Sequence, residues 1–256
     1  MDEKELIQKF AQDEEELLLG KRILELARRA EKTWFSNTDF LTPSQLAFCE
    51  TLLNFSNKDY LSDGGYDGAQ RQLLLFGEGA ALRDPDGPIA ALELQCPKPV
   101  GHRDILGSVL GLGIRREKTG DILIGEKSHV LLIHRDILPY LISNLERIGN
   151  VPVQICETPL SELIPPAPSF DSFQVSVASL RLDAVLAAVC RLSREEAQQQ
   201  IRRGMVQVDY RISDSPSKAV ACGNIISLRG YGKFQIFALA GETRKGKTRL
   251  EIQKYV

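Results

Sequence analysis

The chain has 256 residues, of which 43% are hydrophobic and 26% charged, a composition typical of a soluble globular protein. No stretch approaches the roughly 20 apolar residues of a membrane-spanning helix, and the charged opening MDEKELIQKF predicts neither a secretory signal nor a transit peptide. The five cysteines are scattered and never form a Cys-x-x-Cys pair. We therefore expect reduced thiols that fill the core of a cytoplasmic protein, with no disulfide framework, no bound metal and no cofactor.

Residues 1–82 predict a mainly helical N-terminal domain. Apolar residues recur at helical spacing through 3–31, which indicates one or two amphipathic helices. Thr42 and Pro43 form an N-cap and first-turn pair that opens another helix over 44–55. The turn-forming segment DGGYDG at 63–68 then precedes RQLLLF, which we expect to be a strand.

Residues 83–163 predict a ferredoxin-like domain of the kind seen in RNA-recognition motifs. Strands and helices alternate in the order β-α-β-β-α-β, at 88–95, 102–113, 121–125, 129–135, 135–149 and 151–157. The first three strands contain no aromatic residue, so we do not expect bases to stack on this sheet, and a protein-docking or structural role stays open. The loop 113–121 offers Arg115, Arg116 and Lys118 as secondary RNA contacts, or is an ordinary solvated loop.

A proline-rich linker is predicted at 164–172, where the charge of the chain changes sign. From Ser172 onward there are fourteen Lys and Arg against seven Asp and Glu, which leaves eighteen against twenty-seven in the preceding residues. Proline fixes φ and removes a backbone donor, so IPPAPSFDS reads as a semi-rigid spacer. An acidic body followed by a basic domain is a pattern typical of nucleic-acid-binding proteins.

Residues 173–256 predict a second α/β domain, which makes the whole chain α+β. A helix is expected over 179–190. Ser193 with Glu196 forms a capping box that opens a second helix, which runs to Arg203 and is followed by Gly204 as its C′ residue. Strands should follow at 205–212 and 225–230, then a terminal hairpin of 234–240 and 249–256. The intervening GETRKGKT fits a phosphate-binding loop, but that chemistry needs a helix after the loop, so we expect a basic hairpin tip.

The basic side chains of this domain gather on and beside its two helices. A helix dipole favours cations at the C-terminal Arg202 and Arg203, but not at Arg194 in the first turn. The polar residues that we expect to contact RNA are Arg181, Arg191, Ser193, Arg194, Gln198, Arg202, Arg203, Arg211, Lys218, Arg229 and Lys233.

Several short segments of the basic domain resemble the S4-type RNA-binding domain. They are 180–183, Ser193-Arg194, 201–204, 206–209 and 223–226. GGYDGAQRQ at 64–72 and the segment 102–125 are similar to the bodies of YlmH-type proteins, so the resemblance spans nearly the whole chain. The length and style are similar to the cyanobacterial and plastid branch known as the photosystem II S4 domain protein. Two departures make the surface less typical, namely Asp209-Tyr210 in place of an Asn-Gly turn, and Glu195-Glu196 with Gln198–Gln200 on the second helix.

The resemblance implies a non-enzymatic protein that binds structured ribosomal or transfer RNA at the large ribosomal subunit, where stalled complexes are handled. Two alternatives stay open. The first is a photosystem II assembly factor whose acidic body docks a protein partner, peripheral to the thylakoid membrane. The second is an RNA-modifying enzyme, since Arg181-Leu182-Asp183 is similar to the Arg-Leu-Asp motif of pseudouridine synthases.

Overall fold

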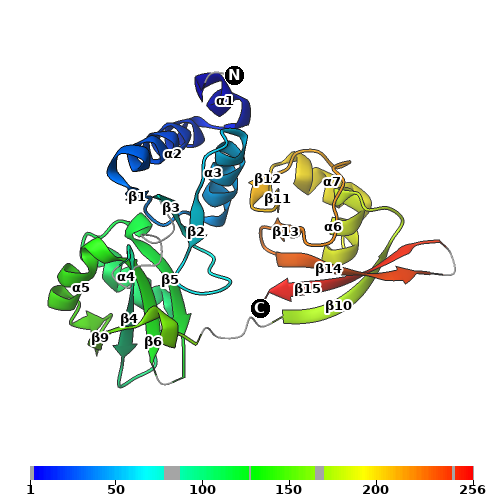
Figure 1. Ribbon diagram of the computed structural model, residues 1–256. Coiled ribbons are helices and arrows are strands. Elements are labelled where there is room, and N and C mark those ends of the chain that lie inside the picture. Colours follow the sequence, from blue (N-terminus) through cyan, green and yellow to red (C-terminus); the bar gives the residue numbers. More distant parts are fainter. Residues whose placement is uncertain (1–2, 78–86, 127, 165–169, 244–245, 256) are drawn as a thin grey trace. The chain divides into compact units, whose positions relative to one another are not determined.

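The protein divides into two compact units, Met1–Pro166 and Ala167–Val256 (Figure 1). The computed structural model describes residues 3–77, 87–126, 128–164, 170–243 and 246–255. No helix in these ranges has both the length and the apolar character needed to cross a membrane.

The N-terminal part of the first unit combines three helices with a small antiparallel sheet. The helices are α1 (Glu3–Phe10), α2 (Glu14–Thr33) and α3 (Pro43–Phe55). The strands are β1 (Phe35–Asn37), β2 (Leu61–Asp63) and β3 (Leu73–Gly77), in the order β1-β3-β2. The predicted helices and the strand after DGGYDG are confirmed, and the Thr42 capping box with Gln45 opens α3. The sheet partners β1 and β2 were not predicted, because three-residue strands carry too little periodicity to be recognised.

The central part has the predicted ferredoxin-like order. Its four-stranded antiparallel sheet runs β5-β6-β4-β9, with the strands β4 (Ile89–Gln95), β5 (Thr119–Ile124), β6 (His129–His134) and β9 (Gln154–Thr158). The helices α4 (His102–Gly111) and α5 (Leu138–Asn144) pack on one face of it. Short 3₁₀ turns, Arg116–Lys118, Arg135–Ile137 and Leu160–Glu162, connect these elements.

The single helix predicted over 135–149 is wrong in its second half. The chain leaves the helix at Leu145 and forms a small hairpin of β7 (Arg147–Ile148) and β8 (Val151–Pro152). Gly149 provides the turn of this hairpin with a φ of 55°, a conformation that glycine adopts at low cost. The last predicted strand is likewise split into β8 and β9, since Pro152 has no N–H to continue a ladder.

The strand β3 is buried on both faces and joins two hydrophobic cores. Leu74 and Phe76 pack with the helices α1 to α3, whereas Leu73 and Leu75 pack with Phe40 against the central sheet. That core includes residues of β4, β5 and β6, so the N-terminal part covers the sheet face opposite α4 and α5. The aromatic-free sheet is therefore a packing surface over this area, closed to a stacked base.

Gly120 allows this close packing. A Cβ atom at Gly120 would lie 2.7 Å from the Phe40 ring and 2.9 Å from Leu132 Cβ. A side chain at this position of β5 would displace Phe40 from the face of the central sheet.

The second unit is a six-stranded antiparallel sheet with two helices on one face. Its strands run β10-β15-β14-β13-β11-β12. Their bounds are β10 (Phe170–Val177), β11 (Val206–Val208), β12 (Arg211–Ile212), β13 (Ile225–Leu228), β14 (Gly232–Glu242) and β15 (Thr248–Tyr255). The helices α6 (Leu182–Cys190) and α7 (Arg194–Arg202) bury their apolar faces against it.

Three expectations for this unit can be compared with the structure. The terminal hairpin is confirmed, and a strand, β15, follows Gly246-Lys247 where a phosphate-binding loop would need a helix. The strand β10 was not predicted and begins at Phe170, inside the segment assigned to the linker, of which 165–169 lie outside the described residues. All cysteines are free, but Cys156 and Cys222 are exposed, so their assignment as core filler was wrong.

Candidate nucleic-acid interface

A fully buried carboxylate lies at the start of α6. Asp183 is in the first turn of the helix, and its side chain has no exposed surface. Its N–H donates to the carbonyl of Pro216 at 3.0 Å, and the N–H of Leu182 donates to the carbonyl of Lys218 at 2.9 Å. These two bonds hold the turn that carries Lys218 beside the beginning of α6.

Three side chains donate hydrogen bonds to the Asp183 carboxylate. Arg181 donates through Nε and Nη2 at 3.2 Å each. Arg194, at the first position of α7, donates through the same two nitrogens at 3.2 and 3.3 Å. Gln198, one turn further along α7, adds its amide at 2.8 Å. Asp183 thus connects the two helices and orients both guanidinium groups by two-pronged contacts.

The arginines remain accessible although they are held in place. The side chains of Arg181 and Arg194 are 43% and 52% exposed, and with one carboxylate between them they leave a net charge of +1. Each guanidinium has five N–H donors and uses two of them on Asp183. The remaining donors can bind an anion at a defined position, which suits a phosphate.

The environment of Asp183 lowers its pKa and gives a testable pH dependence. Burial alone would raise the pKa, but the hydrogen bonds from Arg181, Gln198 and Arg194 outweigh it and hold the pKa at about 2. The unfolded chain titrates near the usual aspartate value of about 3.9. The stabilisation is therefore complete above about pH 4 and is lost as the pH falls toward 2.

We expect the free energy of unfolding of the second unit to decrease over this interval. Denaturant titrations at several pH values should detect the decrease, and Asp183→Asn should remove this component of the pH dependence. An unchanged pH profile in the variant would contradict the assignment.

A second group of cations lies at the other end of α7. Arg202 is the last residue of the helix, Arg203 is its C-cap, and both are exposed. Gly204 follows with a φ of 70°, as predicted for the residue after the cap. The N–H of Arg229 contacts the carbonyl of Met205 at 3.4 Å, which brings Arg229 to the same turn. At about 1.5 Å per residue, the two groups are separated by roughly 12 Å along α7.

The other predicted contacts of this unit have local structural partners. Ser193 caps α7, its Oγ accepting the N–H of Glu196 at 3.1 Å. Arg191 is the C-cap of α6, with a left-handed φ of 55°. Arg211 lies in the edge strand β12. The Nζ of Lys233 lies 4.7 Å from the ring centroid of Tyr210 and 4.6 Å from that of Tyr255.

The departure at Asp209-Tyr210 is accommodated by a side-chain clamp. Both residues have positive φ, 50° and 66°, in the turn where the resemblance to the S4-type domain implies Asn-Gly. The Asp209 carboxylate accepts the N–H of Ile225 at 2.8 Å and the side-chain amide of Asn224 at 2.7 Å. These bonds stabilise a turn that glycine would form without them.

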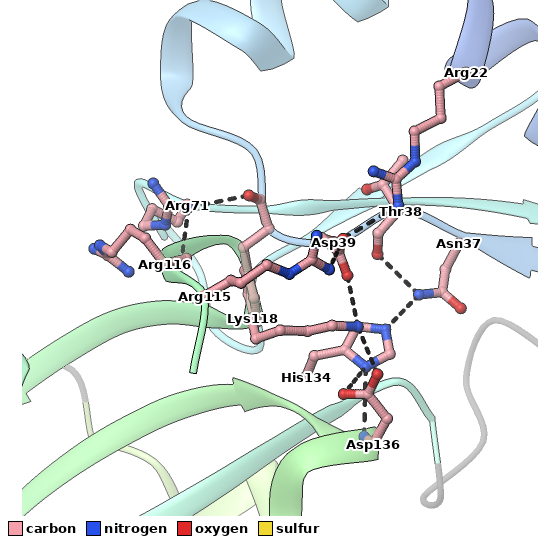
Figure 2. Close-up of polar contacts among 11 residues, drawn as sticks. Arg22, Asn37, Thr38, Asp39, Arg71, Arg115, Arg116, Lys118, His134 and Asp136 are labelled. Carbon is pink, nitrogen blue, oxygen red and sulfur yellow. Dashed lines mark hydrogen bonds and ion pairs between the residues drawn. The ribbon is translucent and has the colours of Figure 1, made fainter. Parts of the chain in front are cut away.

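Of the three predicted secondary contacts, only Arg115 has a largely exposed side chain. The Arg116 guanidinium donates to the carbonyl of Thr119 at 2.8 Å. Lys118, 17% exposed, forms ion pairs with Asp39 at 2.7 Å and with Asp136 (Figure 2). Burial lowers the pKa of Lys118, but its hydrogen bonds to Asp136 and Asp39 outweigh burial and raise it. Arg115 is 64% exposed and approaches Asp39 at 3.7 Å.

The ion pairs of Lys118 belong to a polar cluster that connects the N-terminal and central parts of the first unit. Asn37 contacts His134 Nε2 at 2.7 Å, and His134 Nδ1 lies 2.9 Å from Asp136. Burial lowers the pKa of His134, which favours the neutral form of the ring. Figure 2 shows Arg22 and Arg115 reaching Asp39 from opposite sides. The cluster is thus a structural contact, and most of the loop cations are used in it.

Asp183 is the site residue that the sequence prediction missed. The expected contacts were chosen by positive charge and hydrogen-bonding capacity, so an acid was passed over. One sequence signal could have identified Asp183: it is an acid that lies two residues after Arg181 and precedes the predicted helix that carries Arg194 and Gln198. Asp183 is buried and accepts five hydrogen bonds, so its carboxylate does not face solvent. This position argues against a catalytic role for the Arg181-Leu182-Asp183 segment, which resembles a synthase motif.

Comparison with known proteins places these features in one family. Three family models match in succession, described as "YlmH, N-terminal" at 15–79, "Putative RNA-binding domain in YlmH" at 89–162 and "S4 domain" at 180–226. The chain is 30% identical over 258 residues to "Ribosome-associated protein quality control protein P2" of Bacillus subtilis (strain 168), covering 98% of each chain. A solved structure, "Cell division protein ylmH from Streptococcus pneumoniae", has a similar fold, with a TM-score of 0.51 and 24% identity over 60% of this chain and 97% of that one. These descriptions name no photosystem, and that branch stays a prediction.

Proposed function

Because this chain belongs to the YlmH family, we propose that it is a non-enzymatic cytoplasmic protein that binds structured ribosomal or transfer RNA at the large ribosomal subunit. The relative from Bacillus subtilis is named for ribosome-associated quality control, and we extend that role, the handling of stalled complexes, to this protein. The binding surface is the exposed side of α6 and α7 in its S4 domain.

The observation that carries the proposal is the arrangement around Asp183. A buried carboxylate orients Arg181 and Arg194, which remain half exposed. At the other end of α7, exposed Arg202 and Arg203 lie beside the turn of Arg229. Two separated cationic groups, one beside each end of α7, suit contacts with two phosphates of a folded RNA backbone. Lys218, held beside α6 by the bond to Leu182, adds a further cation to the first group.

Salt dependence tests the contacts at the C-terminal end of α7. Phosphate contacts release counterions, and each contributes about 0.9 to the slope of log K against log salt concentration on a regular duplex. We expect Arg202→Gln/Arg203→Gln to weaken binding to a ribosomal RNA helix and to flatten the slope by about 2. Filter binding over a series of salt concentrations measures both quantities.

A matched control separates contact from overall charge. Lys247→Gln/Arg249→Gln removes the same charge from exposed residues near the β14–β15 turn. This variant should keep most of the slope. An equal flattening in both variants would show that only net charge matters, and the contact assignment would then be rejected. Failure of the intact protein to co-sediment with large ribosomal subunits would reject the proposed function itself.

A further inference from the structure

The six-stranded sheet of the second unit has one face that α6 and α7 leave uncovered. The two helices pack against buried residues of the other face, such as Phe234, Ile236 and Ile252. Side chains alternate between the two faces of a strand, so the sequence neighbours of these core residues belong to the uncovered face, which we call the outer face. The registers of the strands show which of its side chains lie next to one another.

One row of side chains crosses the outer face over all six strands. In order from β12 to β10 it consists of Ile212, Gln207, Ser227, Lys233, Tyr255 and Phe170. The register of Phe234 with Lys254 places Lys233 beside Tyr255. None of the six side chains is buried, so the whole row keeps accessible surface.

Aromatic rings and a cation gather at the β14–β10 end of this row. The rings of Phe170 and Tyr255 meet edge to face, with their centroids 4.9 Å apart. The Nζ of Lys233 lies 4.6 Å from the centroid of Tyr255 and 4.7 Å from that of Tyr210. The adjacent row consists of Ile225, Gln235, Gln253 and Ser172. The two rows therefore offer ring surfaces, amides, hydroxyls and an ammonium group and contain no acid, while Glu251 lies in the row beyond them.

The β12 end of the row lies beside the cations at the C-terminal end of α7. A Cβ atom at Gly204 would lie 3.7 Å from Ile212 Cγ2, and Gly204 directly follows Arg202 and Arg203. An RNA strand that leaves the proposed phosphate contacts of these two arginines therefore meets the row first at Ile212.

We infer that the outer face binds an unpaired segment of RNA, whose bases stack on Tyr255 and Phe170 while Lys233 binds a phosphate. Sheets that present aromatic rings bind single-stranded RNA by stacking its bases and by hydrogen bonds to their edges, and here Gln207, Gln235 and Gln253 supply donors and acceptors for those edges. The inference rests on the proposed function in that RNA is the ligand, and it adds a contact for unpaired nucleotides.

The chemistry of the outer face favours RNA over a second copy of the chain. The centre of a stable dimer interface is more apolar than rows made mainly of glutamine, serine and tyrosine. The excess of basic over acidic residues from Ser172 onward also suits a polyanion.

An RNA helix with a single-stranded tail tests the inference in the intact protein. A ribosomal RNA helix that ends in a short tail of unpaired uridines should bind about tenfold more tightly than the same helix with blunt ends, the contribution of one stacked base. Tyr255→Ala should abolish this difference and leave binding of the blunt helix unchanged, which also shows that the unit stays folded. A tail that adds no affinity would overturn the inference. Failure of the intact protein to bind the blunt helix would reject the contacts of the proposed function instead.

Labelled oligouridylate, which forms no base-paired structure, gives an independent readout by fluorescence anisotropy. We expect Tyr255→Ala to weaken its binding about tenfold and Tyr255→Phe to retain most of the affinity, because a phenylalanine ring can still stack. Tyr140→Ala, at an exposed tyrosine of the first unit, should bind like the unaltered protein. Equal affinity of the alanine and phenylalanine variants at Tyr255 would reject stacking. A doubled mass in light scattering that Tyr255→Ala abolishes would reject RNA in favour of a second copy of the chain.

Salt dependence tests the role of Lys233. Lys233→Gln should flatten the slope of log K against log salt concentration for oligouridylate by about 0.7, the value for one phosphate contact on a single strand. Lys9→Gln is the matched control, because Lys9 also lies over two aromatic rings, those of Phe10 and Phe55, but in the first unit. Equal changes of slope in the two variants would show an effect of net charge alone and would overturn the assignment of Lys233.

Discussion

Replacing Asp183 by asparagine is expected to weaken binding of structured RNA at least tenfold and to destabilise the second unit by about 3 kcal/mol. The carboxylate accepts hydrogen bonds from Arg181, Arg194 and Gln198. An asparagine amide has the same shape but presents N–H groups where an acceptor is needed. Breaking a buried ion pair on one side costs about 3–5 kcal/mol, and the lower end applies because both arginines are half exposed and regain solvent.

The direction of this effect distinguishes an organising carboxylate from simple electrostatics. The substitution makes the protein more positive, so net charge alone predicts tighter binding to RNA. Loss of guanidinium orientation predicts weaker binding. Asp171→Asn, at an exposed position of β10 in the same unit, makes the same change of charge and should bind RNA as well as or slightly better than the unaltered protein. Filter binding and urea denaturation measure the two effects, and tighter binding by Asp183→Asn would reject the organising role.

Replacing Phe40 by alanine is expected to lower the free energy of unfolding of the first unit by about 4 kcal/mol. Phe40 is fully buried between the N-terminal part and the central sheet, and truncation of such a side chain typically costs about 3–5 kcal/mol. Its ring lies where Gly120 leaves room for it, so the cavity cannot be filled by a small shift of a neighbouring side chain. The emission of Trp34 during urea denaturation reports on this unit alone.

Phe55→Ala is the matched control for this substitution. Phe55 is 61% exposed and packs against the tilted ring of Phe10 with a centroid separation of 4.7 Å, so its loss should cost about 1 kcal/mol. An equal decrease in the free energy of unfolding for Phe40→Ala and Phe55→Ala would show that the contact between the N-terminal part and the central sheet contributes little to stability. Binding of structured RNA by the second unit should be unaffected in both variants under conditions where they stay folded.

The sequence was most informative where a local signal determined the structure. The N-cap at Thr42 and the capping box of Ser193 with Glu196 satisfy the first N–H groups of a helix within four residues, so both helix starts could be read directly from the sequence. The order of elements in the central sheet could be predicted because hydrophobic periodicity is also a local signal. Gly204 was recognisable as a helix end because a left-handed residue is needed there.

The features that were missed depend on contacts between residues distant in sequence. The strands β1 and β2 exist because β3 pairs with both, and nothing within three residues indicates that pairing. Burial of the central sheet by Phe40 and Leu75 could not be inferred either, because an apolar strand looks the same whichever element covers it. The orientation of Arg181 and Arg194 depends on one buried acid, Asp183. Its contact with Arg194 joins residues that are eleven positions apart in the sequence.

Because both faces of β3 are buried, the apolar residues of this strand are covered at different times during synthesis of the chain. Leu74 and Phe76 face helices that lie upstream in the chain, but the sheet face that covers Leu73 and Leu75 includes Leu132 in β6. At about 5–20 residues per second, the ribosome needs roughly 3–12 s to make the intervening segment. Throughout that interval the N-terminal part exposes Leu73 and Leu75 to solvent, because the central sheet that covers them is incomplete. We therefore expect nascent chains halted between β3 and β6 to be the species most dependent on chaperones and most prone to aggregate.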